Sequence, residues 1–217
     1  HFLDKDYYGL ITFLLSAANI VLPLMVLGMQ HTIVKFYSSY QEKELKDGFL
    51  ITSLLLPLLV IIPVGIFGMF AYESIADLIS VQNPIIKKYT YLIFLVSIFM
   101  GYFEVFYAWT KVQFQSVVGN FIKEVFVRFM TSVLLIAVYL GWISNAQFIY
   151  AVVGAYSLQV SIMFLYAITV YKPIFKLKIP PNIKEILSFS MYIIMAGSAG
   201  TILLEIDKFM IPQMRQI

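Results

Sequence analysis

Residues 49–71 read FLITSLLLPLLVIIPVGIFGMFA, an apolar stretch without a single charged side chain. A helix needs about 20 apolar residues to cross the hydrocarbon core of a bilayer. Lipid offers no hydrogen-bonding partner, so a backbone that crosses it must form its hydrogen bonds internally, as an α-helix does. The stretch therefore predicts a transmembrane helix.

Further apolar stretches of similar length accompany it along the chain. We expect spans at residues 7–29, 49–71, 89–110, 119–143, 146–171 and 186–204. The composition agrees, because 61% of the residues are hydrophobic and 12% are charged, whereas soluble domains carry about 25% charged residues. The sequence predicts an all-α fold, a polytopic transmembrane helical bundle of about six spans.

The distribution of Lys and Arg predicts the topology. Cytoplasmic connections carry an excess of these residues. Ten of them fall at the connections after the first, third and fifth spans, including the start of the fourth, and three fall at the opposite ends. We therefore expect the first span to run from outside to inside.

Residues 171–184 form the longest of the basic connections and contain Pro173, Pro180, Pro181 and four lysines. Prolines stiffen a chain into an extended form. We expect a cytoplasmic linker between a first helical lobe at 1–170 and the first helix of a second lobe at 185–217; an ordinary basic loop is the alternative. The chain begins with His1 rather than Met, which favours an internal piece of a longer protein.

Proline and glycine inside the spans indicate places where helices bend or pack closely. Proline removes a backbone hydrogen bond and kinks a helix, and small residues allow close helix contact. Both are common in membrane helices without any functional role. The candidate hinges are Pro23, Pro57, Pro63, Gly197 and Gly200.

Charged side chains at membrane depth are costly and usually face a bundle interior or a wet cavity. Glu104 lies late in the third span, and Glu205, Asp207 and Lys208 close the last one. Glu205 and Lys208 are three residues apart and share a helix face, whereas Asp207 points roughly 200° away from Glu205. These groups indicate either a charge-lined cavity or span ends that reach the headgroups.

Two further pairs are spaced four residues apart on predicted helices. Glu124 and Arg128 predict an interfacial pair that fixes the depth of the fourth span. His31 and Lys35 share a face at the inner end of the first span, where a cationic pair is a candidate for binding phosphate. Solvation at the membrane edge is the alternative for His31.

Several kinds of chemistry have no motif in this sequence. There is no cysteine, there are two histidines, and neither a phosphate-binding glycine loop nor an HExxH motif is present. The sequence therefore predicts no metal site, no cofactor and no nucleic-acid partner. It favours transport over enzymatic catalysis.

Four segments carry a family resemblance: LDKDYYGL at Leu3–Leu10, GMQHTIVKFY at Gly28–Tyr37, VFVR at Val125–Arg128 and EIDKFMI at Glu205–Ile211. In this order and spacing they resemble segments of the bacterial polysaccharide biosynthesis proteins, the oligosaccharide flippases of the multidrug/oligosaccharidyl-lipid/polysaccharide exporter superfamily. Lys35 stands where the family usually has arginine, which keeps the charge and loses the fork-shaped donor.

The resemblance implies helices two to seven of a transporter with 12 to 14 helices. Such a protein moves undecaprenyl-pyrophosphate-linked oligosaccharide, a precursor of polysaccharides such as O-antigen, between the leaflets of the bacterial inner membrane by alternating access. It implies lipid-linked oligosaccharide and membrane lipids as partners, and Na⁺ or H⁺ as a coupling ion. Lys35, Lys208 and His31 are then candidates for the pyrophosphate, and Glu104 or Asp207 for the ion.

Other functions fit parts of the same pattern. A cation-coupled multidrug exporter of the same superfamily would use Glu104 and Asp207 in an apolar cavity. A membrane-embedded glycan polymerase or ligase would need a large outer loop with catalytic Arg or His, and the predicted outer connections are short. A structural scaffold would leave the charges at membrane depth without a purpose.

Overall fold

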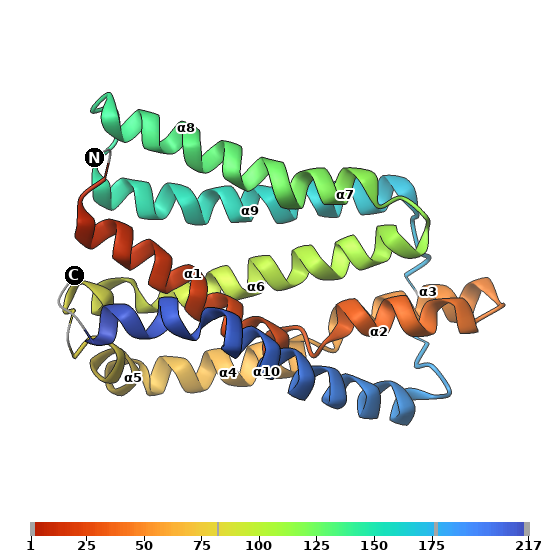
Figure 1. The fold of residues 1–217 in the computed structure, drawn as a ribbon. Helices are drawn as coiled ribbons and strands as arrows, with labels where there is room; N and C mark the ends of the chain where they lie inside the picture. Colours follow the sequence, from red (N-terminus) through yellow and green to blue (C-terminus); the bar gives the residue numbers. More distant parts are fainter. Residues whose placement is uncertain (1–2, 82, 176–177, 215–217) are drawn as a thin grey trace.

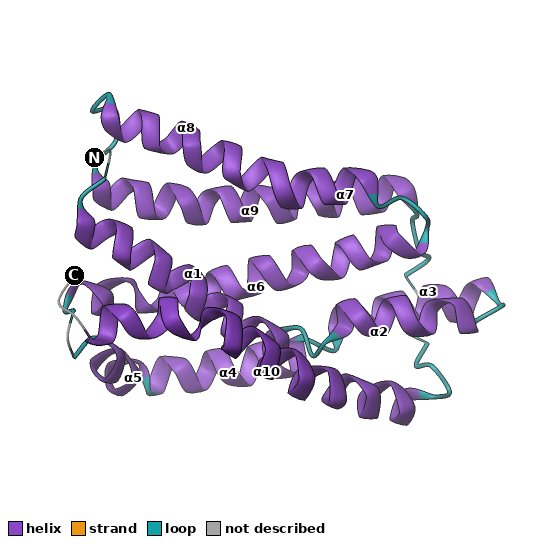
Figure 2. Ribbon diagram, viewed as in Figure 1, coloured by secondary structure: helices purple, strands orange, loops and turns teal. Residues whose placement is uncertain are grey.

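The computed structural model describes residues 3–81, 83–175 and 178–214, and the regular elements of this part are all helices (Figure 2). Among the described residues, five helical segments are long and apolar enough to cross a membrane, with residues 43–70 counted as one segment. They correspond to the expected spans at 7–29, 49–71, 89–110, 146–171 and 186–204. The predicted polytopic helical bundle is confirmed.

The expected span at 119–143 differs from the other five because it is not one regular helix. It consists of α7 (Val117–Phe121), a π-helical turn (Ile122–Phe126) and α8 (Val127–Tyr139). Each segment alone is too short to span a membrane, although together they run along α9 (Asn145–Val170) as one rod (Figure 1). At 1.5 Å per residue this rod is on the order of 30 Å long, the thickness of the hydrocarbon core.

The first expected span also breaks, two residues after Pro23. Helix α1 (Lys5–Met25) ends there, and α2 (Met29–Phe36) begins after a turn in which Leu27 and Gly28 have φ values of 50° and 59°. A left-handed backbone favours glycine. A Cβ on Gly28 would also lie 2.8 Å from Cγ2 of Ile193. The turn redirects the chain so that α2 lies against α10 (Ile183–Met214).

The second span contains a break at Pro57 and none at Pro63. Helix α3 (Lys43–Leu55) and α4 (Leu58–Phe70) meet at Leu56–Pro57, where proline supplies no N–H to continue the ladder. Pro63 lies within α4. A 3₁₀ turn (Tyr37–Ser39) precedes α3, and the short α5 (Tyr72–Ile79) follows α4.

Helix α6 (Ile85–Val112) is the centre of the bundle: α1, α2 and α9 pack against it, and α8 packs on the outside of α9 (Figure 1). Helix α10 crosses α1, and a Cβ on Gly197 would lie 3.9 Å from Cβ of Pro23. Helix α10 stays unbroken at Gly197 and Gly200.

Successive long segments run in opposite directions, so the Lys/Arg-rich connections gather at one end of the bundle (Figure 1).

The expected linker at 171–184 is anchored to the beginning of α3. Asp47 is 1% exposed, and its carboxylate accepts hydrogen bonds from the Tyr171 hydroxyl at 2.6 Å and the Ile174 N–H at 3.1 Å. Burial and this hydrogen bond raise the pKa of Tyr171. The Tyr40 hydroxyl donates to Oδ1 of Asn182 at 2.5 Å. The linker therefore packs on α3 in its described part; residues 176 and 177 lie outside the described residues.

Large apolar side chains are exposed on the outer faces of the bundle. Phe67, Met69 and Phe70 on α4 and Phe129 on α8 are more than half exposed. A soluble protein seldom exposes such patches to water. These faces suit a hydrocarbon environment, in agreement with a multi-pass membrane protein.

Candidate functional site

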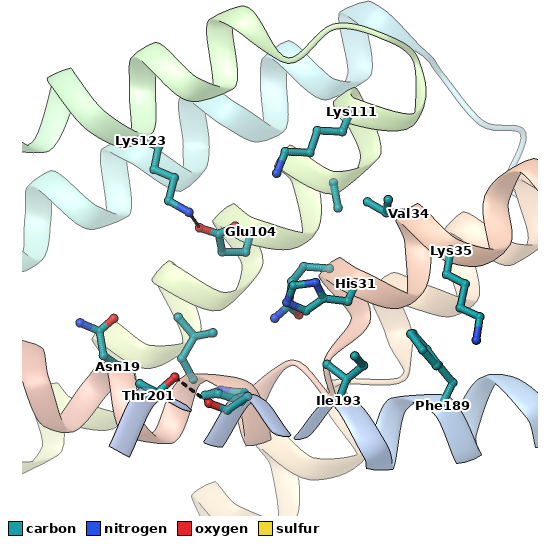
Figure 3. Close-up of a pocket in the computed structure, with 15 residues that line it drawn as sticks. Asn19, His31, Val34, Lys35, Glu104, Lys111, Lys123, Phe189, Ile193 and Thr201 are labelled. Atoms are coloured by element: carbon teal, nitrogen blue, oxygen red, sulfur yellow. Dashed lines mark hydrogen bonds and ion pairs between the residues drawn. The ribbon is translucent and has the colours of Figure 1, made fainter. Parts of the chain in front are cut away.

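A cavity of about 650 Å³ lies between α1, α2, α6, the π-helical turn and α10 (Figure 3). Its charged lining consists of cationic or titratable nitrogen groups and a single carboxylate. These side chains are His31, Lys35, Lys111, Lys123 and Glu104. Charges at membrane depth are expensive unless they serve a wet cavity or a ligand, so this cavity is the candidate site.

The most direct interaction in the cavity joins Lys123 to Glu104, with 2.6 Å between Nζ and Oε1 (Figure 3). The Glu104 side chain is 21% exposed and that of Lys123 is 43% exposed. The carboxylate is thereby neutralised by a lysine from the segment that follows α6. The remaining cations of the cavity have no carboxylate partner among its lining residues.

The chain reversal after α6 brings Lys123 back toward Glu104. Phe114 has φ 60°, and the Gln115 N–H donates to the Thr110 carbonyl at 2.9 Å, which closes the turn. Lys123 then lies in the π-helical turn, where the amide of the buried Gln159 donates to the Ile122 carbonyl at 3.3 Å. Such turns within helices frequently occur at functional sites.

Lys111 was not among the sequence-based candidates, although it counted toward the topology. Glu104, Ala108 and Lys111 all line the cavity from α6, and their spacing of four and three residues places them on one helix face. Nζ of Lys111 lies 3.9 Å from the centroid of the Tyr107 ring. This spacing is the signal in the sequence that could have identified Lys111.

His31 and Lys35 line the opposite wall from α2, as their spacing predicted. In Figure 3 the imidazole of His31 points toward the cavity, while Lys35 extends toward Phe189 on α10. Nζ of Lys35 lies 3.8 Å from the centroid of the Phe189 ring, a cation–π contact between α2 and α10. Lys35 thus occupies the rim, where α10 packs.

Two amides complete the polar lining and were also missed by sequence reasoning. Asn19 lies on α1 and Gln30 on α2. Oε1 of Gln30 is buried without a hydrogen-bond partner in the described structure. Buried polar groups are normally satisfied, so this amide leaves hydrogen-bonding capacity at the cavity wall. Single amides in apolar spans carried no pattern that could have marked them.

A second cavity of about 370 Å³ adjoins the first between α1, α6, α8 and α9. Glu104 and Lys123 line both cavities, and Glu124 and Arg128 line only the smaller one. The predicted pair is present, with 3.0 Å between Nη2 of Arg128 and Oε2 of Glu124. The Glu104–Lys123 ion pair is therefore part of the wall shared by the two cavities, together with Asn19 and Leu22.

The charges near the end of α10 do not line either cavity. Nζ of Lys208 lies 3.1 Å from Oε2 of Glu205, and the hydroxyl of Ser16 on α1 donates to the same oxygen at 2.9 Å. The rings of Phe13 and Phe209 stack beside them. Asp207 is exposed on the other face, as helical geometry required. The Ser16–Glu205 hydrogen bond and the Phe13–Phe209 contact link α10 to α1.

The described residues contain no group of three or more His, Cys, Asp or Glu side chains arranged to hold a metal ion. The polar lining of the cavity offers lysine ammonium groups, an imidazole, amides and the Glu104 carboxylate. Such groups bind anions and hydroxyl-rich ligands through charge-assisted and ordinary hydrogen bonds.

The comparisons with known proteins agree with the resemblance drawn from the motifs. Neither the curated proteins nor the solved structures gave a match to this chain. The family model described as polysaccharide biosynthesis protein matches residues 1–217, the whole chain. The chain therefore belongs to the polysaccharide biosynthesis protein family.

Proposed function

We propose that this protein carries undecaprenyl-pyrophosphate-linked oligosaccharide from the inner to the outer leaflet of the bacterial inner membrane, by alternating access and without catalysing a reaction. The observation that carries the proposal is the cation-lined cavity between membrane-crossing helices. A pyrophosphate in lipid must be neutralised, and lysines at membrane depth must be solvated or paired. The lysines would neutralise the pyrophosphate, and the pyrophosphate would provide the lysines with a charged partner.

The geometry suggests a division of roles within the cavity. Lys111 and Lys123 face the phosphates from one wall and His31 from the other, with Lys35 at the rim. The amides of Asn19 and Gln30 suit sugar hydroxyls. Lys208, a candidate from the sequence, is engaged by Glu205 on the same helix away from the cavity, so we do not assign it to the pyrophosphate.

The larger architecture of the transporter is part of the same proposal. Helix α10 is the least buried of the long helices. Of the residues in its most apolar part, 17% are buried within the structure, compared with 39% to 56% in the other candidate spans. This exposure supports α10 as the first helix of a second lobe, with residues 171–184 as the cytoplasmic linker. The breaks after Pro23 and at Pro57 are our candidate hinges, together with Pro63, Gly197 and Gly200.

A cation-coupled multidrug exporter is less well supported by the cavity. Among the described residues, Glu104 is the one carboxylate that lines this cavity, and it is paired with Lys123, while Asp207 is exposed on α10. An organic cation in this cavity would be repelled by the lysines that line it. Whether Na⁺ or H⁺ drives the lipid-carrier cycle is a separate part of the proposal, with Glu104 as the carboxylate best placed to respond.

The test compares two lysines of the same helix. Lys111→Gln removes a charge from the cavity, and Lys88→Gln removes one from the exposed opposite end of α6. In cells that depend on this protein, Lys111→Gln should lower surface glycan and cause lipid-linked oligosaccharide to accumulate on the inner leaflet. Lys88→Gln should leave both unchanged at equal protein abundance. Equal export by the two variants would contradict the proposal.

A further inference from the structure

The pairing of Glu104 with Lys123 raises a question that the proposed function leaves open. A carboxylate at 2.6 Å from a lysine competes with any anion that needs the same ammonium group. A cavity built only to hold anions tightly would not place an acid there. A carrier, however, must also release its cargo, and release requires that binding not be too strong.

Three observations show that the pair is a built feature of the cavity wall. Glu104 and Lys123 line both cavities, as Asn19 and Leu22 do, so the pair is part of their common boundary. Lys123 lies in a π-helical turn, and the buried Gln159 satisfies the Ile122 carbonyl of that turn. The partners come from different segments, so the contact depends on tertiary structure.

The neighbours of the pair favour exchange of partners. Lys111 lines the same cavity two helical turns from Glu104 on one face of α6, and the two side chains interact electrostatically. The Lys123 side chain is 43% exposed, so its ammonium group can swing a short distance toward an anion without first being uncovered. Lys111 supplies a further positive charge to the same cavity when Lys123 has moved.

We propose that Glu104 is an internal competitor for the phosphate of the cargo. In the empty cavity Glu104 holds Lys123. When a phosphate or pyrophosphate group enters, Lys123 transfers its hydrogen bond from the Glu104 carboxylate to a phosphate oxygen, and on release it returns. No covalent bond changes. This inference rests on the proposed function and adds a positioning residue that lowers affinity and favours release.

The test is a double-mutant cycle on the purified complete protein in lipid nanodiscs, with polyprenyl pyrophosphate and inorganic pyrophosphate as separate probes. Glu104→Gln removes the competing charge and keeps the side-chain shape. It should tighten binding by about fivefold, a typical magnitude for a partly exposed ion pair. Lys123→Gln should weaken binding, and Glu104→Gln should have no further effect in the Lys123→Gln background.

Glu104→Asp is the matched control, because it keeps the charge on a shorter side chain and should tighten binding less than Glu104→Gln. A melting curve of each variant verifies that it is folded. If Glu104→Gln tightens the binding of both probes, the effect concerns phosphate groups in general. If it tightens the binding of polyprenyl pyrophosphate alone, the effect concerns the lipid headgroup. Either result supports the proposal.

Two results would overturn the inference while leaving the proposed function in place: no tightening by Glu104→Gln, or equal tightening when Lys123 is already replaced. The second would mean a general field effect instead of competition for Lys123. If the unaltered protein and every variant fail to bind either probe, the proposed function itself is refuted, and the inference is refuted with it.

Discussion

Replacing Asp47 by alanine should detach the linker from α3, and the structure allows the cost to be worked out. The carboxylate is 1% exposed and accepts two hydrogen bonds, from the Tyr171 hydroxyl at 2.6 Å and the Ile174 N–H at 3.1 Å. A hydrogen bond to a charged group contributes about 1.5–3 kcal/mol. Asp47→Ala removes both acceptors, so we expect a loss of about 3 kcal/mol.

Two assays on the protein in detergent measure this loss. The melting temperature should fall by on the order of 5 °C or more, and trypsin should cleave faster after Lys178 in the freed linker. Asp77→Ala is the control, because Asp77 is an exposed acid paired with Lys87 at 2.6 Å. Unchanged melting and cleavage for Asp47→Ala, or equal changes for both variants, would refute the reasoning.

Three further predictions concern local features of the fold. Gly28→Ala should destabilise the protein by about 1–2 kcal/mol in a melting experiment, because residue 28 has φ 59°; an unchanged melting temperature would contradict this. Gln159→Leu should leave the Ile122 carbonyl unsatisfied and weaken pyrophosphate binding through a misplaced Lys123; binding equal to that of the unaltered protein would argue against a role for the π-helical turn. The raised pKa of Tyr171 means that its stabilising contact is complete below about pH 10 and is lost as pH rises further. Tyr171→Phe should therefore flatten the alkaline decline in stability, and parallel curves would contradict this.

The spans and their order could be predicted from the sequence because hydrophobicity and length are local properties. The stretch at 49–71 could be predicted to span the membrane from its own length and lack of charge, without reference to any other residue. The Glu205–Lys208 and Glu124–Arg128 pairs could also be predicted, since helical spacing alone brings their side chains together. The orientation of the bundle in the membrane stays a prediction from the lysine distribution.

The composition of the cavity could be predicted only in part. His31, Lys35 and Glu104 were candidates and do line it, whereas Lys208 is bound elsewhere. The contact of Lys123 with Glu104 depends on the turn at Phe114 and on a π-helical turn, and the hydrophobicity of the flanking stretches specifies the geometry of neither.

Long-range contacts were the other gap. Asp47, just before the second expected span, was not among the residues singled out from the sequence. Its partner Tyr171 is 124 residues away in the sequence. No local pattern connects a buried acid to a tyrosine in a distant linker. The alternating topology places both residues at the same end of the bundle, but their contact is visible only in the folded structure.

The most direct test of the central claim measures movement of the lipid itself. The complete protein would be reconstituted in liposomes with a fluorescent polyprenyl-pyrophosphate oligosaccharide, and its transfer between leaflets followed by quenching from outside. We predict transfer that depends on the protein, is reduced at least about tenfold when Lys111 and Lys123 are both replaced by glutamine, and is unaffected by Lys88→Gln. Transfer at an equal rate with and without the two cavity lysines would contradict the account.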